Sequence, residues 1–408
     1  MSSPQLSRGA LNRALLDRQL LLHPATLPTD ASGRSQRAQG VIEVIEQLAG
    51  LQAQAPFPPY YGLWSRLDGF EPGDLAALIT GRQVVRIALM RGTIHLVSAR
   101  DCLAMRPLMQ PVLDRGLTVH FGRQRPGLDR AALAAAGRAL VEEKPMTFSE
   151  IGAALSGRWP DYPPAALAQG VRALVPLVQV PPRAVWGASG QARHTSAESW
   201  LGPDSAQAGL PEAGPASPTA DPDRAAADRP DRAVSVATLD GLVLRYLAGF
   251  GPASTADAQA WSGLTRLSEV TDRLRPRLRV FRDENGTELF DLPDAPRPDP
   301  DTPVGVRMVA EFDNLLLSHA DRGRVISDEG RQRLFTKNGI FPGTVLIDGF
   351  AAGLWRITRS AATATLTVEP FGKISLKNRE AVAREGARLL AFAAAGTPEH
   401  DVRIKAAG

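Results

Sequence analysis

Helix-forming segments followed by two short alternating strands form the pattern that most constrains how this chain can fold. Its clearest instance has helical segments at residues 236–247, 255–262 and 266–275, followed by LRVFRDENGTELFDL at residues 278–292. Asn285-Gly286, between the two strands, is a strong signal for a two-residue hairpin turn. Helices followed by such a hairpin describe a winged helix, the helix-turn-helix variant with an added β-wing.

The same pattern is predicted twice earlier in the chain, although no residue-level repeat accompanies it. The first instance has predicted helices at residues 11–22, 41–51 and 71–78 and a hairpin at residues 84–97. In the second, predicted helices at residues 129–143 and 164–177 flank one that Thr147 and Glu150 open as a capping box. Its predicted strands are residues 178–180 and 185–186. We therefore predict an α+β fold with tandem winged-helix domains and a β-rich C-terminal part.

Changes in composition give the expected domain boundaries. Prolines among Ala, Gly, Asp and Ser, without any aromatic residue, indicate a flexible linker at residues 204–232. The other predicted parts are winged helix 1 (1–125), winged helix 2 (126–203), winged helix 3 (233–298) and a β-rich C-terminal region with a terminal helix (299–408). That helix is predicted at residues 378–392.

A Gln-x-Gln segment follows the predicted helix at residues 41–51. Gln52 and Gln54 can point the same way only in extended backbone, and their two carboxamides would then converge on one spot. Each carboxamide offers both donors and acceptors, which suits a polarised water molecule. A bare Gln-x-Gln also occurs by chance, and glutamine commonly decorates helix ends, so the spacing alone does not predict catalysis.

The surrounding residues carry a family resemblance. LxGLQAQAPxPPYxGLWSRL, from Leu48, followed by VVRIALMRGTIHLV resembles the winged-helix DNA glycosylases of the AlkZ type. Further matching segments are EFDNLLLSHADRGRVI from Glu311, GTVLIDGFAAGLWRI from Gly343 and VEPFGKIS from Val368. The resemblance therefore covers nearly the whole chain, and this sequence has the Gln-x-Gln form of a motif whose other form is Gln-x-Asp.

The resemblance implies a DNA repair enzyme that excises bulky N-alkylated purines and unhooks interstrand cross-links, in a setting such as self-resistance to a DNA-alkylating natural product. It implies that Gln52 and Gln54 are catalytic. Two glutamines cannot protonate a leaving base, so their chemistry favours purines that alkylation at N7 or N3 has already made cationic. No lysine lies in the segment to form a Schiff base, so we expect a monofunctional glycosylase. The pattern of helices and hairpins alone would favour a transcriptional regulator, because winged helices are more often sequence readers than enzymes.

Candidate contacts with double-stranded DNA come from basic and aromatic residues. The predicted DNA-binding residues are Arg86, Arg91, Arg275, Arg277, Arg279, Arg322 and Lys337, and the candidates for substrate contact are Tyr60, Tyr61 and His95. A solvated helix end and edge strand would also explain the arginines near residue 277, and a buried histidine would explain His95. For His319 and Asp321, a hydrogen bond that fixes a loop is preferred over a catalytic dyad.

Composition excludes several other classes. Lys plus Arg number 47 against 43 acidic residues, a net charge of +4 that by itself implies no particular partner. The single Cys102 excludes an internal disulfide and a cysteine-based zinc site, and the histidines lack metal-ligand spacing, so no metal or cofactor is expected. Without a signal sequence or a long apolar run, we expect a cytoplasmic monomer that associates with the nucleoid when bound to DNA. No membrane association or obligate protein partner is expected.

Overall fold

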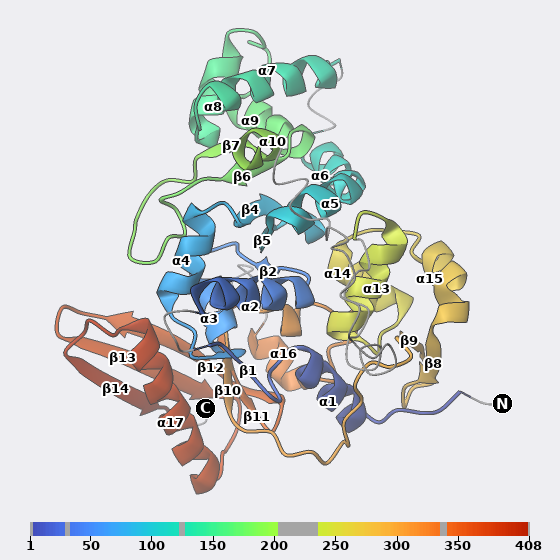
Figure 1. Ribbon diagram of the computed structural model, residues 1–408, viewed down its shortest axis with the longest axis vertical. Coiled ribbons are helices and arrows are strands. Elements are labelled where there is room, and N and C mark those ends of the chain that lie inside the picture. Colours follow the sequence, from blue (N-terminus) through green and yellow to red (C-terminus); the bar gives the residue numbers. More distant parts are fainter. Residues whose placement is uncertain (1–2, 29–32, 122–126, 203–235, 335–340, 407–408) are drawn as a thin grey trace, which may run out of the picture.

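The protein has an α+β fold, as predicted, and the computed structural model describes residues 3–28, 33–121, 127–202, 236–334 and 341–406 (Figure 1). The predicted linker at residues 204–232 and Lys337 lie outside the described residues. None of the described helices is long and apolar enough to cross a membrane. Among the same residues, no group of three or more His, Cys, Asp or Glu side chains is arranged to hold a metal ion.

The first part of the chain combines helices with a β-hairpin. Its elements are α1 (Arg8–Arg18), β1 (Ala25–Thr26), α2 (Arg34–Gln47), β2 (Leu51–Gln52), α3 (Pro58–Trp64), β3 (Leu67–Asp68), α4 (Pro72–Thr80), β4 (Val84–Ala88), η2 (Met90–Gly92), β5 (Ile94–Ser98), α5 (Ala99–Leu108) and α6 (Gln110–Phe121). Strands β4 and β5 form the predicted hairpin, with the short helix η2 as its turn.

Helix α2 ends earlier than the predicted helix at residues 41–51. Ala49 and Gly50 have φ angles of 50° and 88°, and this left-handed turn ends the helix before the prolines are reached. A Cβ added to Gly50 would lie 2.6 Å from Val97 Cγ1, so the chain can turn this closely to the sheet only with glycine. The turn sends the chain into β2, so Gln52 lies in a strand and not at a frayed helix end.

A five-stranded antiparallel sheet joins the first and second helical groups, with strand order β2-β5-β4-β6-β7. The second group consists of α7 (Arg130–Glu143), α8 (Phe148–Ser156), α9 (Pro164–Leu174), β6 (Leu177–Gln179), β7 (His194–Ser196) and α10 (Ala197–Leu201). The predicted strand at residues 185–186 is wrong. The backbone N–H of Trp186 donates to Tyr60 Oη (3.1 Å), and the Trp186 ring packs on that tyrosine. Strand β7 pairs with β6 where the strand at residues 185–186 was predicted.

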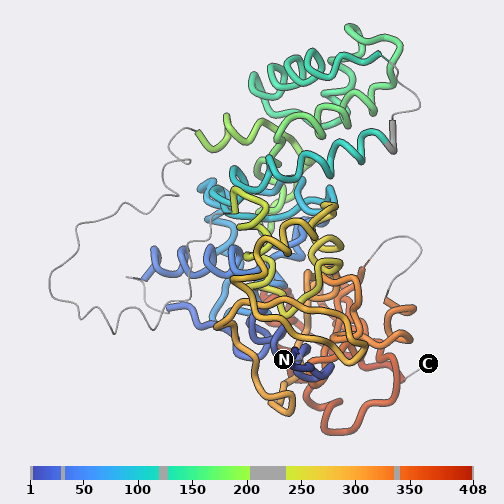
Figure 2. The backbone as a smooth tube through the Cα atoms, turned by 90° about the vertical axis from the view of Figure 1, so that its right-hand side faces the viewer, coloured from blue at the N-terminus to red at the C-terminus, as the bar shows by residue number. Residues whose placement is uncertain are grey.

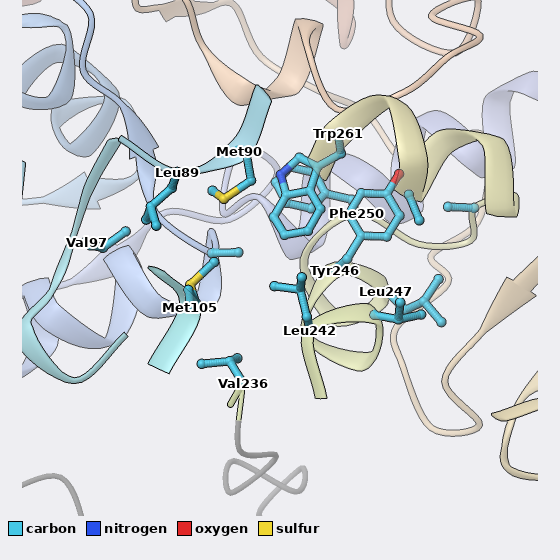
Figure 3. Close-up of a cluster of buried hydrophobic side chains, with 14 of the residues drawn as sticks. Leu89, Met90, Val97, Met105, Val236, Leu242, Tyr246, Leu247, Phe250 and Trp261 are labelled. Atoms are coloured by element: carbon cyan, nitrogen blue, oxygen red, sulfur yellow. The ribbon is translucent and has the colours of Figure 1, made fainter. Parts of the chain in front are cut away.

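The third group packs against the hairpin of the first. It consists of α13 (Leu239–Phe250), α14 (Thr255–Ser262), α15 (Ser268–Leu274), η3 (Arg275–Arg277), β8 (Arg279–Arg282) and β9 (Glu288–Asp291), and its predicted hairpin is confirmed. Figure 3 shows Leu89 and Met90 of the first hairpin facing Tyr246 and Trp261, from α13 and α14. This shared core fixes the third group beside the turn of the first hairpin.

The C-terminal part is a second sheet covered by one long helix. Its elements are β10 (Arg307–Val309), η4 (Asn314–Leu316), α16 (Asp328–Leu334), β11 (Gly343–Ile347), β12 (Phe350–Arg359), β13 (Thr363–Pro370), α17 (Leu376–Ala393) and β14 (Glu399–Ile404). The strand order is β10-β11-β12-β13-β14, and β14 runs parallel to β13. Strand β14 follows α17, so the predicted terminal helix is not the last element. This sheet and helices α7–α9 lie at opposite ends of the molecule (Figures 1 and 2).

Candidate functional site

The Gln-x-Gln segment runs along β5 at the edge of the central sheet. Gln52 is 7% exposed and pairs with His95 across the two strands, while Gln54 is exposed beyond the end of β2. Arg91 Nη2 donates to Gln52 Oε1 at 2.7 Å, and the backbone N–H of Ile94 donates to Gln54 Oε1 at 3.2 Å. Both carboxamides therefore contact the same short stretch of the hairpin, residues 91–94.

These two contacts determine which way each carboxamide points. A guanidinium and a backbone N–H can only donate, so the oxygen of each glutamine must face its partner. Each amide oxygen has a second acceptor site, and neither amide NH₂ group donates to a described residue. Both glutamines can thus still accept from a water molecule and donate to a substrate.

Arg91 is bound to the third helical group as well as to Gln52. Its backbone has a left-handed φ of 55°, and its Nη1 donates to the backbone carbonyl of Trp261 in α14. Burial, with the positive charge of Arg322 nearby, lowers the pKa of Arg91 to about 10, which leaves the guanidinium charged at neutral pH. The predicted phosphate contact of Arg91 is therefore replaced by two contacts within the protein.

Arg86 supports the backbone between the two glutamines. It is 2% exposed, and its Nη2 donates to the Ala53 carbonyl at 2.6 Å. Burial, with the charge of Arg183, lowers the pKa of Arg86 to about 10. A guanidinium enclosed in this way does not reach a DNA phosphate, so the structure corrects the predicted role of Arg86.

Of the three candidates for substrate contact, Tyr60 and His95 are fully buried and Tyr61 is partly buried. Tyr60 is fully buried and donates to the Ala184 carbonyl at 2.7 Å, while the Tyr61 ring packs edge-on against Trp186 and Trp355. Burial raises the pKa of both phenols. His95 is fully buried, and burial with the charge of Arg91 lowers its pKa to about 3, so the ring is neutral. Tyr60 and His95 therefore cannot present their rings to an unstacked base, and the substrate contact of Tyr61 stays a prediction.

The segment from Glu311 fixes the glutamines from a distant part of the sequence. Asp313 forms a fully buried, bidentate ion pair (2.8 and 2.9 Å) with Arg66, which lies two residues after the end of α3. The neighbouring Asn314 donates to the Gly50 carbonyl at 2.6 Å, two residues before Gln52. Composition and spacing gave no sign of this role, and the family resemblance identified only the segment.

His319 and Asp321 form hydrogen bonds with other residues and not with each other, in line with the preference against a catalytic dyad. His319 is buried with its Nε2 at 3.0 Å from the Phe250 carbonyl, and the carboxylate that acts on its pKa is Asp257. Burial lowers the pKa of His319 to about 3, and Asp321 is an exposed loop residue that accepts from the Gly323 N–H. Arg322, the residue after Asp321, is half-buried and close enough to lower the pKa of Arg91.

Three further predicted DNA contacts lie in η3 and at the start of the third hairpin. Arg275 is held by an ion pair with Glu288 (2.8 Å), while Arg277 and Arg279 are exposed. This hairpin packs on α1 through Phe281 and belongs to a different sheet from the glutamines. Arg275, Arg277 and Arg279 are all exposed and stay predictions as phosphate contacts, and Lys337 lies outside the described residues.

Comparison with known proteins assigns the chain to a family. A family model described as "DNA glycosylase AlkZ-like" matches residues 45–392, which include both glutamines, the hairpin and the Asp313 segment. The chain belongs to the AlkZ-like DNA glycosylase family. Its fold is that of Streptomyces sahachiroi DNA glycosylase AlkZ, with a TM-score of 0.73 and 19% sequence identity over 98% of this chain and 100% of that chain. None of the curated proteins compared with it matches.

Membership of this family makes the molecule a DNA glycosylase of DNA repair, with DNA as its substrate. The hairpin turn at Arg91 contacts Gln52, one of the two residues predicted to be catalytic. Gly263, the C-cap of α14 with a φ of 78°, lies against this turn, and an added Cβ would be 3.0 Å from Arg91 Cα.

Replacing Gly263 by Ala is expected to lower excision by the glycosylase about tenfold, because displaced catalytic groups lose rate steeply. The new methyl group must push the Arg91 backbone away, and Gln52 moves with it. Single-turnover excision and thermal melting would be measured together. Gly187→Ala is the matched control, since Gly187 has a similar φ of 76° with nothing within 4 Å of an added Cβ. Equal rates for the two variants would contradict the expectation.

Proposed function

We propose that this DNA glycosylase hydrolyses the N-glycosidic bond of purines alkylated at N7 or N3. The observation that supports the proposal is the convergence of Gln52 and Gln54 on residues 91–94, with both oxygens facing donors. Among the described residues, neither carboxamide hydrogen-bonds to a carboxylate that could serve as a proton donor. The pair suits a reaction that needs an oriented water molecule and charge stabilisation but no strong acid.

In the proposed reaction the bond between the sugar C1′ and the purine nitrogen breaks first. The positive charge of the alkylated base passes to the sugar as an oxocarbenium ion, so the base leaves neutral and needs no proton. A water molecule held by the carboxamides adds to C1′ and loses its proton to solvent. The amide dipoles stabilise the cationic sugar through their oxygens, each of which keeps one acceptor site.

We propose that the enzyme is monofunctional and leaves an abasic site. A strand-cutting glycosylase forms a Schiff base through an amine, commonly that of lysine. The lysines of this chain are Lys144, Lys337, Lys373, Lys377 and Lys405, so none occurs in the first helical group that carries the glutamines. A water nucleophile fits this composition better than an amine does.

Bulky adducts and interstrand cross-links are the proposed substrates, as the family resemblance suggests, with self-resistance to an alkylating natural product as the proposed setting. The exposed side chain of Gln54 supports this, because it can meet an adduct without enclosing it. The enzyme would act as a cytoplasmic monomer on double-stranded DNA. Family membership favours this activity over the transcriptional regulator that the pattern of helices and hairpins alone allowed.

Replacing Gln52 or Gln54 by Ala tests the proposed chemistry. Each variant is expected to release 7-methylguanine from methylated DNA at least about tenfold more slowly, a loss of ~1.4 kcal/mol or more in transition-state stabilisation. Binding to the same duplex should be nearly unchanged, because the glutamines act on the reacting sugar. Gln39→Ala, a change on the exposed side of α2, is the control. If binding falls as far as excision does, the glutamines are structural and the mechanism is wrong.

A further inference from the structure

The two catalytic glutamines are held by different kinds of donor. Gln54 Oε1 accepts from the backbone N–H of Ile94, which every substitution of Ile94 except proline leaves in place. Gln52 Oε1 accepts from the Arg91 guanidinium, so its orientation depends on one side chain. That side chain is itself fixed, since its Nη1 donates to Trp261 of the third helical group.

We propose that Arg91 is a positioning residue for Gln52 and not a DNA ligand; this inference rests on the proposed function. A carboxamide without a partner has two orientations of similar energy, related by exchange of its oxygen and nitrogen. The charged donor of Arg91 removes one of them, because turning the NH₂ group toward the guanidinium would place two donors together. Gln52 is thereby held with its NH₂ group directed away from Arg91 and available to the substrate.

The surroundings of Arg91 support a fixed role. Its backbone lies 3.0–3.2 Å from the position of a Cβ on Gly263, so α14 closes the space behind it. The next residue of the turn, Gly92, accepts from Arg172 Nη2 (2.7 Å) of α9. Helices from the second and third groups therefore hold the turn from two sides. The packing of the third helical group against Arg91 therefore helps to orient Gln52, which belongs to the first helical group.

A double-mutant cycle between Arg91 and Gln52 tests this role. Arg91→Ala is expected to lower the single-turnover rate of 7-methylguanine excision about tenfold or more, while duplex affinity changes by less than about twofold. In a Gln52→Ala background, the same substitution should cost less than about twofold, because the group through which Arg91 acts is gone. Additive losses, or a loss of affinity equal to the loss of rate, would overturn the proposal.

Arg172→Ala is the matched control, since Arg172 contacts the same turn but not Gln52. Its effect should add to that of Gln52→Ala. The same non-additivity for Arg172 would show that any disturbance of the turn acts on Gln52, and it would overturn a specific role for Arg91. If Arg91→Ala does not fold, the cycle is run with Arg91→Lys, whose single ammonium group cannot bond Gln52 and Trp261 in the same fork geometry.

Crystal structures of the wild type and Arg91→Lys provide a reading that does not depend on activity. The Gln52 carboxamide should be ordered in the wild type and turned or disordered in the variant. An unchanged Gln52 would overturn the positioning role even if excision fell. A wild type that released no 7-methylguanine would instead refute the proposed function and leave the structural comparison valid.

Discussion

Replacing Asp313 by Ala is expected to lower the free energy of unfolding by about 3–5 kcal/mol, because it leaves a buried guanidinium unpaired. Both side chains of the Arg66–Asp313 pair are buried, with 0% and 1% exposed. Asp313 Oδ1 also accepts from the Leu315 N–H, so the carboxylate fixes the start of η4. Urea unfolding followed by circular dichroism would measure the change.

Measuring excision by the Asp313→Ala variant as well decides whether Asp313 takes part in the chemistry. Asp321→Ala is the control, because Asp321 is exposed and its loss should change the free energy of unfolding by less than about 0.5 kcal/mol. Asp313 and Asp321 are two of the three carboxylates in the segment from Glu311, and they are the two considered as a general acid. If Asp313→Ala kept its stability and lost excision, the ion pair would not be its main function.

Local signals in the sequence predicted much of the fold. The helix predicted at residues 255–262 is α14, where Ser254 and Asp257 form a reciprocal capping box. The predicted hairpin forms between β8 and β9, but Asp283 bonds to Thr287, so the loop around Asn285-Gly286 is longer than the predicted two-residue turn. Thr147 and Glu150 cap α8 as predicted. Each of these features depends on residues close together in the chain, so its physical cause can be seen in the sequence.

Contacts between distant segments were not predictable in this way. The pairing of β4 with β6 joins strands that were expected in separate winged helices, and no local signal encodes it. Arg86 has the charge of a DNA ligand but lies beneath the Ala53 carbonyl, a position set by the packing of the whole sheet. The catalytic role of Gln52 and Gln54 stays a prediction from the family resemblance, whereas Arg86 and Arg91, predicted as DNA contacts, bond within the protein at the glutamine segment.

The charge of the substrate should control excision more strongly than any single substitution. Neither glutamine can protonate a leaving base, so the enzyme is expected to release 7-methylguanine and to unhook N7-linked cross-links. It should be inactive on uracil, hypoxanthine and O-alkylated guanine, which are neutral and leave poorly without an acid. Matched oligonucleotides that carry either 7-methylguanine or hypoxanthine, followed over the same time course, would measure the difference.

Substituting Asp for Gln54 should reduce excision of 7-methylguanine less than Ala does. A carboxylate can also hold water and stabilise the oxocarbenium ion, and the exposure of Gln54 keeps an added negative charge solvated. The Ile94 N–H, which now donates to Gln54 Oε1, could donate equally to an aspartate oxygen. Hypoxanthine release by the wild type at a rate comparable to that of 7-methylguanine would contradict the expected dependence on substrate charge. It would show that an acid protonates the base, with Asp321 the first candidate because Asp313 is bound to Arg66.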